Sequence, residues 1–279
     1  MDRELKSLLI KYGFSFKKAY GQNFLTDSSL LSSIVEEAGV SENDVVLEIG
    51  CGAGALTKEL CKKAKFVYGY EIDKNLTPVL KEVLKDFNNV SIEFKDVLKE
   101  NPSSLEEKIG KNYIMVANLP YYITTPIIMQ FLEKAKNLKA MVIMVQEEVA
   151  YRLCASPATS DYGAITVAIN LRGKGEIIKR VPRGMFTPSP NVDSAVVKIG
   201  IDKEKYLGVD LDAVREVVRV GFSSRRKMLV NNLMNFFKLS RAQAELALEN
   251  ANIDKTLRGE ALSELDYINL ANAIKELKK

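Results

Sequence analysis

Apolar and polar residues follow two periods along the first 205 residues of the chain, one typical of buried strands and one typical of helices. Short apolar runs predict strands at residues 45–49, 66–70, 90–95, 113–117 and 140–145. Helical spacing predicts helices at residues 55–63, 74–86, 126–136 and 146–154. Strands and helices that alternate in this way predict an α/β fold with a parallel, doubly wound sheet.

Further elements flank this region. Asp27 is placed to cap a helix that Gly39 would end. A helix is predicted to end at residue 171, and two more strands are predicted at residues 175–181 and 194–201. The proline-rich connection between these strands would display Phe186. A position in the apolar core is the alternative for Phe186.

The pattern changes past residue 208, where the strand signals stop. Helical spacing predicts helices at residues 211–222, 227–237, 241–250 and 263–277. Because 279 residues exceed a typical single-domain length, we expect two domains. The first spans residues 1–205, and the second, all-helical domain spans residues 206–279.

A glycine-rich turn follows the first predicted strand, at Gly50, Gly52 and Gly54. Glycines allow a sharp turn and let a ligand approach the backbone closely. The helix expected from Ala55 would point its free N–H groups at the bound molecule. The turn indicates a nucleotide-binding loop, although a turn without a ligand and a dinucleotide fold fit the same spacing.

Carboxylates follow the next two strands. Glu71 is placed to bond ribose hydroxyls, which suits NAD and S-adenosylmethionine equally. Asp96 closes the third strand, where its carboxylate could accept a hydrogen bond from an adenine amino group. Ligands of open α/β sheets lie beyond the carboxyl ends of the strands, so these two acids and the glycine turn would meet in one place.

The fourth strand runs into the sequence Asn118-Leu119-Pro120-Tyr121. The exocyclic amine of adenine is a poor nucleophile, because its lone pair is delocalised into the ring, and acceptors are needed to draw the nitrogen toward tetrahedral geometry. The side-chain oxygen of Asn118 and the backbone carbonyl of Leu119 could each accept one N–H. Pro120 would stiffen the turn, and Tyr121 offers a flat face for a flipped-out base. A strand-end turn with a core tyrosine is the alternative.

These residues closely resemble the signatures of the KsgA-type (RsmA) ribosomal RNA adenine dimethyltransferases over nearly the whole chain. The matching stretches are GQNFL at 21–25, EIGCGAGALT at 48–57, Glu71, Asp96, NLPYYI at 118–123, FTPSPNVDSA at 186–195 and FSSRRKML at 222–229. The resemblance implies a Rossmann-like methyltransferase sheet with a small helical domain. It implies that S-adenosylmethionine is contacted by Asn23, Leu25, Gly50, Glu71, Asp96 and Asn118. Tyr121 and Phe186 would hold the target adenine between them.

Two related groups share part of the pattern, the Erm enzymes, which methylate large-subunit rRNA, and mitochondrial transcription factors that retain the fold. The stretch FSSRRKMLVNNL at 222–233 resembles the small-subunit enzymes and not the Erm tail. A non-catalytic RNA-binding or ribosome-assembly factor is a third hypothesis, but a pure binder has no need of both NLPY and the cofactor residues. The departure at Gly184-Met185 affects only the expected rim of the target pocket.

Composition narrows the chemistry further. The chain has no histidine, which excludes Ser-His triads and most zinc sites and favours chemistry carried by a cofactor. Its three cysteines form no C-x-x-C pair, which argues against zinc and against a disulfide framework. No apolar run approaches the roughly 20 residues of a membrane span, and the N-terminus lacks the apolar segment of a signal peptide. We therefore expect a cytoplasmic protein without a metal or a membrane contact.

Positive charge gathers in two segments. Residues 1–20 hold five basic and two acidic side chains together with aromatic residues at 14, 16 and 20. Such a mixture is typical of a clamp on single-stranded RNA and equally of a terminus tucked under the fold. Residues 215–241 carry seven basic side chains and one acid in a chain of net charge +4, which favours a phosphate contact over a merely solvated helix face. Within them, Arg225, Arg226 and Lys227 would open the helix that runs through residue 237 and bind RNA.

The combined prediction is an S-adenosylmethionine-dependent enzyme that dimethylates N6 of two adjacent adenosines near the 3′ end of 16S rRNA and releases S-adenosylhomocysteine. The RNA target follows from the resemblance. The predicted substrate is small-subunit rRNA within an immature 30S particle, and the predicted role is in ribosome biogenesis. Residues 1–205 would be catalytic, residues 206–279 would bind RNA, and the protein would act as a monomer.

Overall fold

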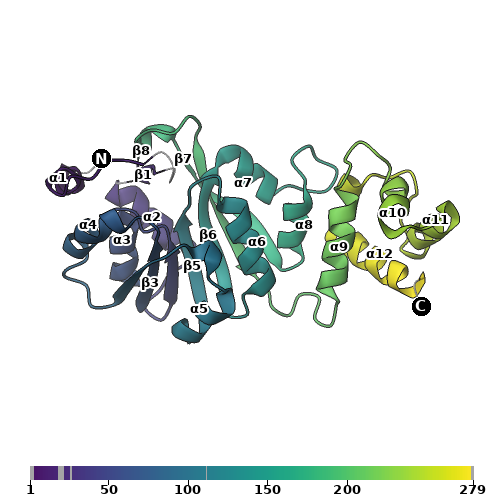
Figure 1. Cartoon of the computed structure of the whole chain (residues 1–279), viewed down its shortest axis with the longest axis horizontal. Coiled ribbons are helices and arrows are strands. Elements are labelled where there is room, and N and C mark those ends of the chain that lie inside the picture. The colour runs from purple at the N-terminus through teal and green to yellow at the C-terminus, as the bar shows by residue number, and fades with distance from the viewer. Residues whose placement is uncertain (1–2, 18–21, 26, 111, 278–279) are drawn as a thin grey trace. The chain divides into compact units, whose positions relative to one another are not determined.

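Strands from the first part of the chain form a seven-stranded sheet (Figure 1). The computed structural model describes residues 3–17, 22–25, 27–110 and 112–277. The strands lie in the order β4 (Val90–Phe94), β3 (Phe66–Glu71), β2 (Val45–Ile49), β5 (Tyr113–Asn118), β6 (Leu138–Gln146), β9 (Ser194–Ile201) and β7 (Gly173–Val181). A separate pair joins β1 (Phe24–Leu25) to β8 (Phe186–Thr187).

The five strands from β4 to β6 run parallel, which confirms the predicted α/β class. All positions of β2 are buried, as expected of a strand covered on both faces. β9 pairs antiparallel with β6, from Gln146 opposite Ser194 to Ala140 opposite Gly200. Mixed sheets of this kind are common among α/β folds. The central parallel strands all end at the same edge of the sheet, where the predicted site residues follow them.

Helices alternate with these strands. They are α2 (Ser28–Ala38), α3 (Ala55–Lys63), η2 (Lys74–Leu76), α4 (Thr77–Val83), η3 (Val97–Lys99), α5 (Pro102–Ile109), α6 (Thr124–Lys134), α7 (Glu147–Leu153) and η4 (Arg183–Met185). The predicted cap of α2 is confirmed, because Asp27 accepts the N–H of Leu30 at 2.8 Å and Gly39 ends the helix at φ 76°. The single helix predicted over 74–86 is divided into η2 and the shorter α4. Pro78 lies in the first turn of α4 and has no N–H to continue the preceding turn.

Two helices were not predicted. In α1 (Arg3–Lys11), Leu5 and Leu9 are buried in an apolar cluster that includes Val79 and Leu80 of α4. In α5, Asn101 accepts the N–H of Ser103 at 3.2 Å and Pro102 occupies the first turn. An N-cap residue followed by proline is a local start signal, so α5 was readable from the sequence.

The aromatic residues of the N-terminal segment pack against one another. The ring centroids of Phe14 and Phe16 lie 5.8 and 5.3 Å from that of Phe24 in β1. Together with the buried face of α1, this packing agrees with a terminus tucked against the fold. Tyr20, Lys18 and Gly21, which entered the alternative prediction of an RNA clamp and the GQNFL signature, lie outside the described residues.

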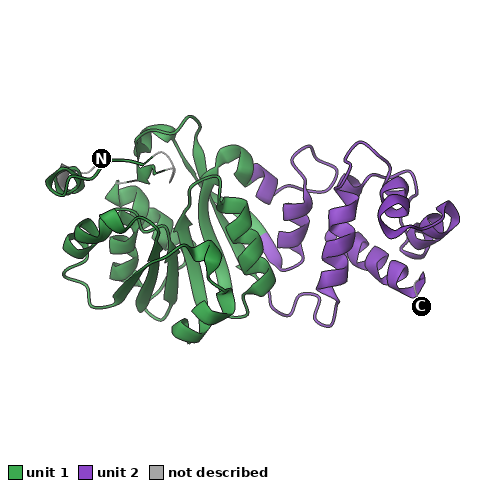
Figure 2. Cartoon of the chain, in the orientation of Figure 1, with its two compact units in different colours: residues 1–150, 175–201 green, residues 151–174, 202–279 purple. Residues whose placement is uncertain are grey.

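The chain divides into two compact units (Figure 2). The first contains residues 1–150 and 175–201, and the second contains residues 151–174 and 202–279. The helices of the second unit are α8 (Ala164–Asn170), α9 (Leu211–Gly221), α10 (Leu229–Phe237), α11 (Arg241–Asn250), η5 (Gly259–Ala261) and α12 (Glu264–Leu277).

This division differs from the predicted one, in which everything before 206 belonged to the first domain. Residues 151–174 belong to the second unit because Tyr162, Val167 and Leu171 are buried in the same apolar cluster as Val217 and Leu233 of the C-terminal helices. The first unit is therefore built from two separate stretches of the chain. None of the helices in the described part of the chain is long and apolar enough to cross a membrane.

Candidate active site

A cavity of about 240 Å³ lies in the first unit. Its walls come from the residues that follow β2, β3, β4 and β5, together with β1 and β8. All of the predicted cofactor and catalytic residues line it, namely Asn23, Leu25, Gly50, Glu71, Asp96, Asn118, Leu119, Tyr121 and Phe186. The fold thus gathers in one place residues that are up to 163 positions apart, counting from 23 to 186.

The glycine turn is held by the strand beside it. Gly50 donates its N–H to the carbonyl of Tyr70 at 2.8 Å, and its φ of 78° lies in the left-handed region that favours glycine. Gly52 has a φ of 55°, and a Cβ there would lie 3.2 Å from the ring of Phe24. Both glycines are therefore required by backbone conformation, and Gly52 also by the close approach of β1.

Glu71 is a buried carboxylate at the end of β3. It accepts the N–H of Gly52 at 2.7 Å and that of Asp73 at 2.8 Å. Burial raises the pKa of Glu71, and these backbone donors oppose the increase. The carboxylate thus holds the glycine turn, and its remaining lone pairs face a cavity that can receive hydroxyl donors.

Asp96 follows β4 and lies at the opening of the short helix η3. One carboxylate oxygen accepts the N–H of Leu98 at 3.1 Å. The other oxygen lies 3.9 Å from Lys99 Nζ, and the side chain is partly exposed and lines the cavity, so this oxygen can still accept a hydrogen bond from a bound molecule. Glu71 and Asp96 are therefore acceptors at the ends of adjacent strands, an arrangement that suits a ribose and an adenine amine.

The N-terminal segment is anchored beside Glu71. Asp73 accepts hydrogen bonds from Lys17 Nζ at 2.8 Å and from Gln22 Nε2 at 3.1 Å. Burial by itself would raise the pKa of Asp73, but Lys17 and its other donors lower the pKa below the ordinary value. This anchoring was not predicted, since nothing in the local sequence pairs Lys17 with Asp73.

A second buried acid lies beneath the glycine turn. Glu48 in β2 is completely buried, and its two carboxylate oxygens accept no hydrogen bond from the described residues. Burial raises the pKa of Glu48 to about 7, and the neighbouring Thr57 hydroxyl and Cys51 thiol, which do not reach hydrogen-bond geometry, oppose the increase only in part. The signal in the sequence was an acid inside an otherwise apolar strand.

The turn after β5 orients its polar groups. Asn118 donates from Nδ2 to the backbone carbonyl of Asn23 at 3.4 Å, and its oxygen accepts no hydrogen bond from the described residues. The N–H of Ile123 donates to the carbonyl of Pro120 at 3.1 Å, which closes the turn. Asn118 thus connects β5 to Asn23, the residue before β1, while its oxygen remains available as an acceptor.

The two predicted aromatic partners differ in burial. The hydroxyls of Tyr121 and Ser194 of β9 are 2.9 Å apart, and burial raises the pKa of Tyr121. Phe186 is only 4% exposed and belongs to an apolar cluster with Val181 and Val196, yet it also lines the cavity. Phe186 is therefore buried as the core alternative expects, and its contact with the target base stays a prediction.

The cavity also has residues that the sequence analysis missed. Ile72 and Tyr122 line it and are 45% and 63% exposed. Ile72 directly follows Glu71, and Tyr122 directly follows Tyr121. This adjacency to predicted site residues was the only sign in the sequence that they line the cavity.

The basic triplet does not open a helix as predicted. α10 begins at Leu229, and Arg225, Arg226 and Lys227 lie in the preceding turn. The free N–H groups at the start of α10 therefore belong to residues that follow the triplet. The prediction of a helix N-terminus at this point is wrong.

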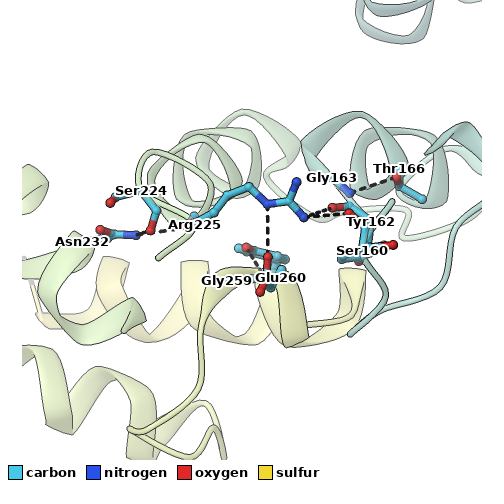
Figure 3. Close-up of polar contacts among 11 residues, drawn as sticks. Ser160, Tyr162, Gly163, Thr166, Ser224, Arg225, Asn232, Gly259 and Glu260 are labelled. Atoms are coloured by element: carbon cyan, nitrogen blue, oxygen red, sulfur yellow. Dashed lines mark hydrogen bonds and ion pairs between the residues drawn. The ribbon is translucent and has the colours of Figure 1, made fainter. Parts of the chain in front are cut away.

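Arg225 is bound to the rest of the second unit (Figure 3). Its Nε donates to Glu260 at 3.1 Å, and its NH2 group donates to the carbonyls of Ser160 and Tyr162 at 3.1 Å each. Asn232 of α10 holds the same turn through the carbonyl of Ser224 at 3.3 Å. The guanidinium thus connects three segments that are remote in the sequence.

Arg226 and Lys227 differ from their neighbour. Both are exposed, and their side chains make no hydrogen bond or ion pair with the described residues. Free cations on a turn that Arg225 and Asn232 hold in place can bind phosphate without first breaking an ion pair.

Among the described residues, no group of three or more His, Cys, Asp or Glu side chains is arranged to hold a metal ion.

Comparisons with known proteins agree with this site. The model of the ribosomal RNA adenine dimethylase family matches residues 13–274. The ribosomal RNA small subunit methyltransferase A of Bacillus licheniformis is 42% identical over 98% of this chain and 96% of its own length. That of Geobacillus thermodenitrificans is 43% identical over 98% of this chain and 95% of its own.

Solved structures share the fold. A dimethyladenosine transferase from Plasmodium falciparum has a TM-score of 0.78 and 26% identity over 91% of this chain and 98% of that one. The 23S rRNA methyltransferase ErmE has a TM-score of 0.70 and 28% identity over 91% of this chain and all of its own. The fold is therefore the Rossmann-like α/β type of these methyltransferases. With a family match over nearly all of its length, this chain belongs to the ribosomal RNA adenine dimethylase family.

Proposed function

We propose that the protein is a 16S rRNA adenine dimethyltransferase that transfers methyl groups from S-adenosylmethionine to N6 of two adjacent adenosines near the 3′ end of small-subunit rRNA. The observation that carries the proposal is the shared cavity, in which acceptors suited to a nucleoside cofactor and the acceptors of an NLPY turn line one space. The names of the relatives, small subunit methyltransferase A, support the choice of RNA.

The cofactor fits the donors and acceptors of the first unit. Gly50 leaves room beside the backbone, Glu71 would accept from ribose hydroxyls, and Asp96 would accept from the adenine amine. Asn23, whose carbonyl accepts from the amide of Asn118, and Leu25 of β1 would close over the cofactor. S-adenosylmethionine, when bound, supplies an electrophilic methyl group on sulfur.

The target adenine would enter from the side of the NLPY turn. The oxygen of Asn118 and the carbonyl of Leu119 would each accept one N–H of the exocyclic amine and so turn its lone pair toward the methyl group. Tyr121 and Phe186 would hold the ring on its two faces. The chain's main contributions are orientation and acceptors for the amine protons, which is what an in-line displacement demands.

The second unit would bind the rRNA backbone through Arg226 and Lys227. We infer that the substrate is an immature 30S particle, that the enzyme acts as a cytoplasmic monomer in ribosome biogenesis, and that it releases S-adenosylhomocysteine and needs no metal. The basic turn supports the RNA contact, and the absence of histidine limits metal ligands to carboxylates, thiols and carbonyls.

Transfer of labelled methyl groups tests the proposal. The purified protein is incubated with S-adenosylmethionine and either small or large ribosomal subunits that lack adenine dimethylation, and the labelled bases are mapped. Dimethyladenosine at two adjacent positions near the 3′ end of 16S rRNA is expected. Label on large-subunit rRNA would support an ErmE-like activity, which the structural similarity makes the second candidate, and label on neither subunit would reject both.

A further inference from the structure

Two tyrosines occupy successive positions on one tight turn. Pro120 and Ile123 close the turn through a backbone hydrogen bond of 3.1 Å, and the hydroxyl of Thr124 donates to the same Pro120 carbonyl at 3.3 Å. Tyr121 and Tyr122 are the two central residues. Because the backbone is held on both sides, it also sets the directions in which the two side chains leave the turn.

The two rings have opposite surroundings. Tyr121 is partly buried and its hydroxyl pairs with the fully buried Ser194. Tyr122 is 63% exposed and lines the same cavity. One ring therefore lies inside the cavity wall, and the next ring along the chain lies at the cavity rim, facing solvent.

An exposed tyrosine is common on protein surfaces and by itself indicates nothing. The position of Tyr122 separates it from an ordinary surface residue, because it lines the cavity that, under the proposed function, a flipped base enters. A base that leaves its stack also leaves the adjacent nucleotide with one face uncovered. A flat aromatic ring at the rim covers that face at little entropic cost, since the turn already holds the tyrosine backbone.

We propose that Tyr122 is the stacking platform for the nucleobase next to the target adenosine, so that the turn carries two aromatic subsites for two successive nucleotides. The proposal rests on the proposed function and adds a binding subsite to it. It assigns Tyr121 to the reacting base and Tyr122 to its neighbour, whichever of the two adenosines is reacting.

Variants of Tyr122 test the stack. Tyr122→Ala should lower kcat/KM for undimethylated small subunits about 5- to 150-fold, the range that corresponds to the loss of one base–aromatic stack. The loss should fall mainly on KM for the particle. Tyr122→Phe keeps the flat ring and should stay near the wild-type value. Tyr151→Ala, which removes another exposed tyrosine from outside the cavity, is the matched control and should change neither parameter.

A substrate without the neighbouring base separates stacking from a general effect on the turn. Small subunits are reconstituted around 16S rRNA that carries an abasic nucleotide beside one target adenosine. On this abasic particle, kcat/KM of the wild-type protein should fall about as much as Tyr122→Ala lowers it on the normal particle. The Tyr122→Ala variant should lose little more kcat/KM when it is given the abasic particle. Independent, multiplicative losses would overturn the proposal.

The outcomes also distinguish this proposal from the proposed function. Wild-type methylation together with an unimpaired Tyr122→Ala variant overturns the Tyr122 subsite alone. If the wild-type protein methylates no small subunit, the proposed function and the subsite that depends on it are both rejected. Thermal unfolding of each variant, which should match that of the wild-type protein, excludes a folding defect as the cause.

Discussion

Leu25 of β1 lies directly opposite Phe186 of β8 in an antiparallel pair. The strand that carries Leu25, which we propose to contact the cofactor, is therefore paired with the strand that carries Phe186, which we propose to contact the target base. This two-residue pair joins two walls of the cavity. Asn118 adds a second connection, to the carbonyl of Asn23 just before β1.

The first prediction concerns Asn118. Asn118→Ala should abolish methylation, because the reacting amine loses its side-chain acceptor. S-adenosylmethionine should still bind, at most several-fold weaker, since the change removes only one long side-chain hydrogen bond among the described residues, the one to the carbonyl of Asn23. Methyl transfer is measured in parallel with cofactor binding by calorimetry. A turnover rate equal to that of the wild-type protein would contradict the proposed mechanism.

The second prediction separates the two roles of Phe186. Phe186→Leu keeps an apolar side chain in the buried cluster and should cost less than about 1.5 kcal/mol of unfolding free energy. Loss of the flat face should weaken base capture by about 1 to 3 kcal/mol, seen as a higher KM for RNA.

Phe131→Leu is the control for that experiment. Phe131 is equally buried in α6 but lies outside the cavity, so its replacement should cost similar stability and leave KM unchanged. If both leucine variants have wild-type kinetics, Phe186 belongs to the core and not to the target site.

The third prediction distinguishes the basic side chains of the turn before α10. Arg226→Ala and Lys227→Ala should each lower the slope of log affinity against log salt by roughly 0.7 to 0.9 if each neutralises one phosphate. Both should leave thermal stability and cofactor affinity unaltered, because neither side chain has a partner among the described residues and the cofactor residues lie in the other unit.

Arg225→Ala should behave differently. It removes one ion pair and two hydrogen bonds to carbonyls from a half-exposed group, so the unfolding free energy should fall by roughly 1 to 2 kcal/mol. The RNA affinity of Arg225→Ala should also fall, because the turn that holds Arg226 and Lys227 is no longer fixed. The slope of log affinity against log salt should change little. A slope reduced as in Arg226→Ala, at full stability, would instead identify Arg225 as a phosphate ligand.

The fourth prediction concerns the pH dependence of stability. The folded-state pKa of Glu48, about 7, exceeds its ordinary value of 4.5, so the folded protein binds the proton more tightly than the unfolded chain does. The contribution of this proton to stability is complete below pH 4.5 and is lost as the pH rises to about 7. Glu48→Gln removes the titration and should gain stability relative to the wild-type protein by up to about 1.4 kcal/mol per pH unit between pH 5 and 7.

Denaturant unfolding of both proteins across that range, without cofactor, provides the measurement. Glu106→Gln is the control, because the carboxylate of Glu106 accepts the N–H groups of Lys136 and Asn137 and its replacement should destabilise the protein at neutral pH. A constant difference between Glu48→Gln and wild type from pH 5 to 7 would contradict the raised pKa.

The local chemistry of the site could be predicted from the sequence. A buried strand, a glycine turn and an acid after the next strand are encoded within short stretches, because apolar runs and glycine conformations depend on neighbouring residues. Parallel strands then bring their carboxyl ends to one edge, so Gly50, Glu71, Asp96 and Asn118 could be expected together before their distances were known. The start of α5 is encoded equally locally, by the cap Asn101 and by Pro102.

Other features were decided only by the tertiary structure. Residues 151–174 join the second unit because their apolar side chains pack against residues some 50 to 100 positions later in the chain. The local hydrophobic pattern contains no information on such distant partners. Whether Arg225 is a free cation or an internal tie depends on Glu260 and on the carbonyls of Ser160 and Tyr162. The exposure of Tyr122 beside the partly buried Tyr121 likewise depends on where β9 presents Ser194. Each of these outcomes is a contact between segments far apart in the chain, so it becomes defined only when the chain has folded.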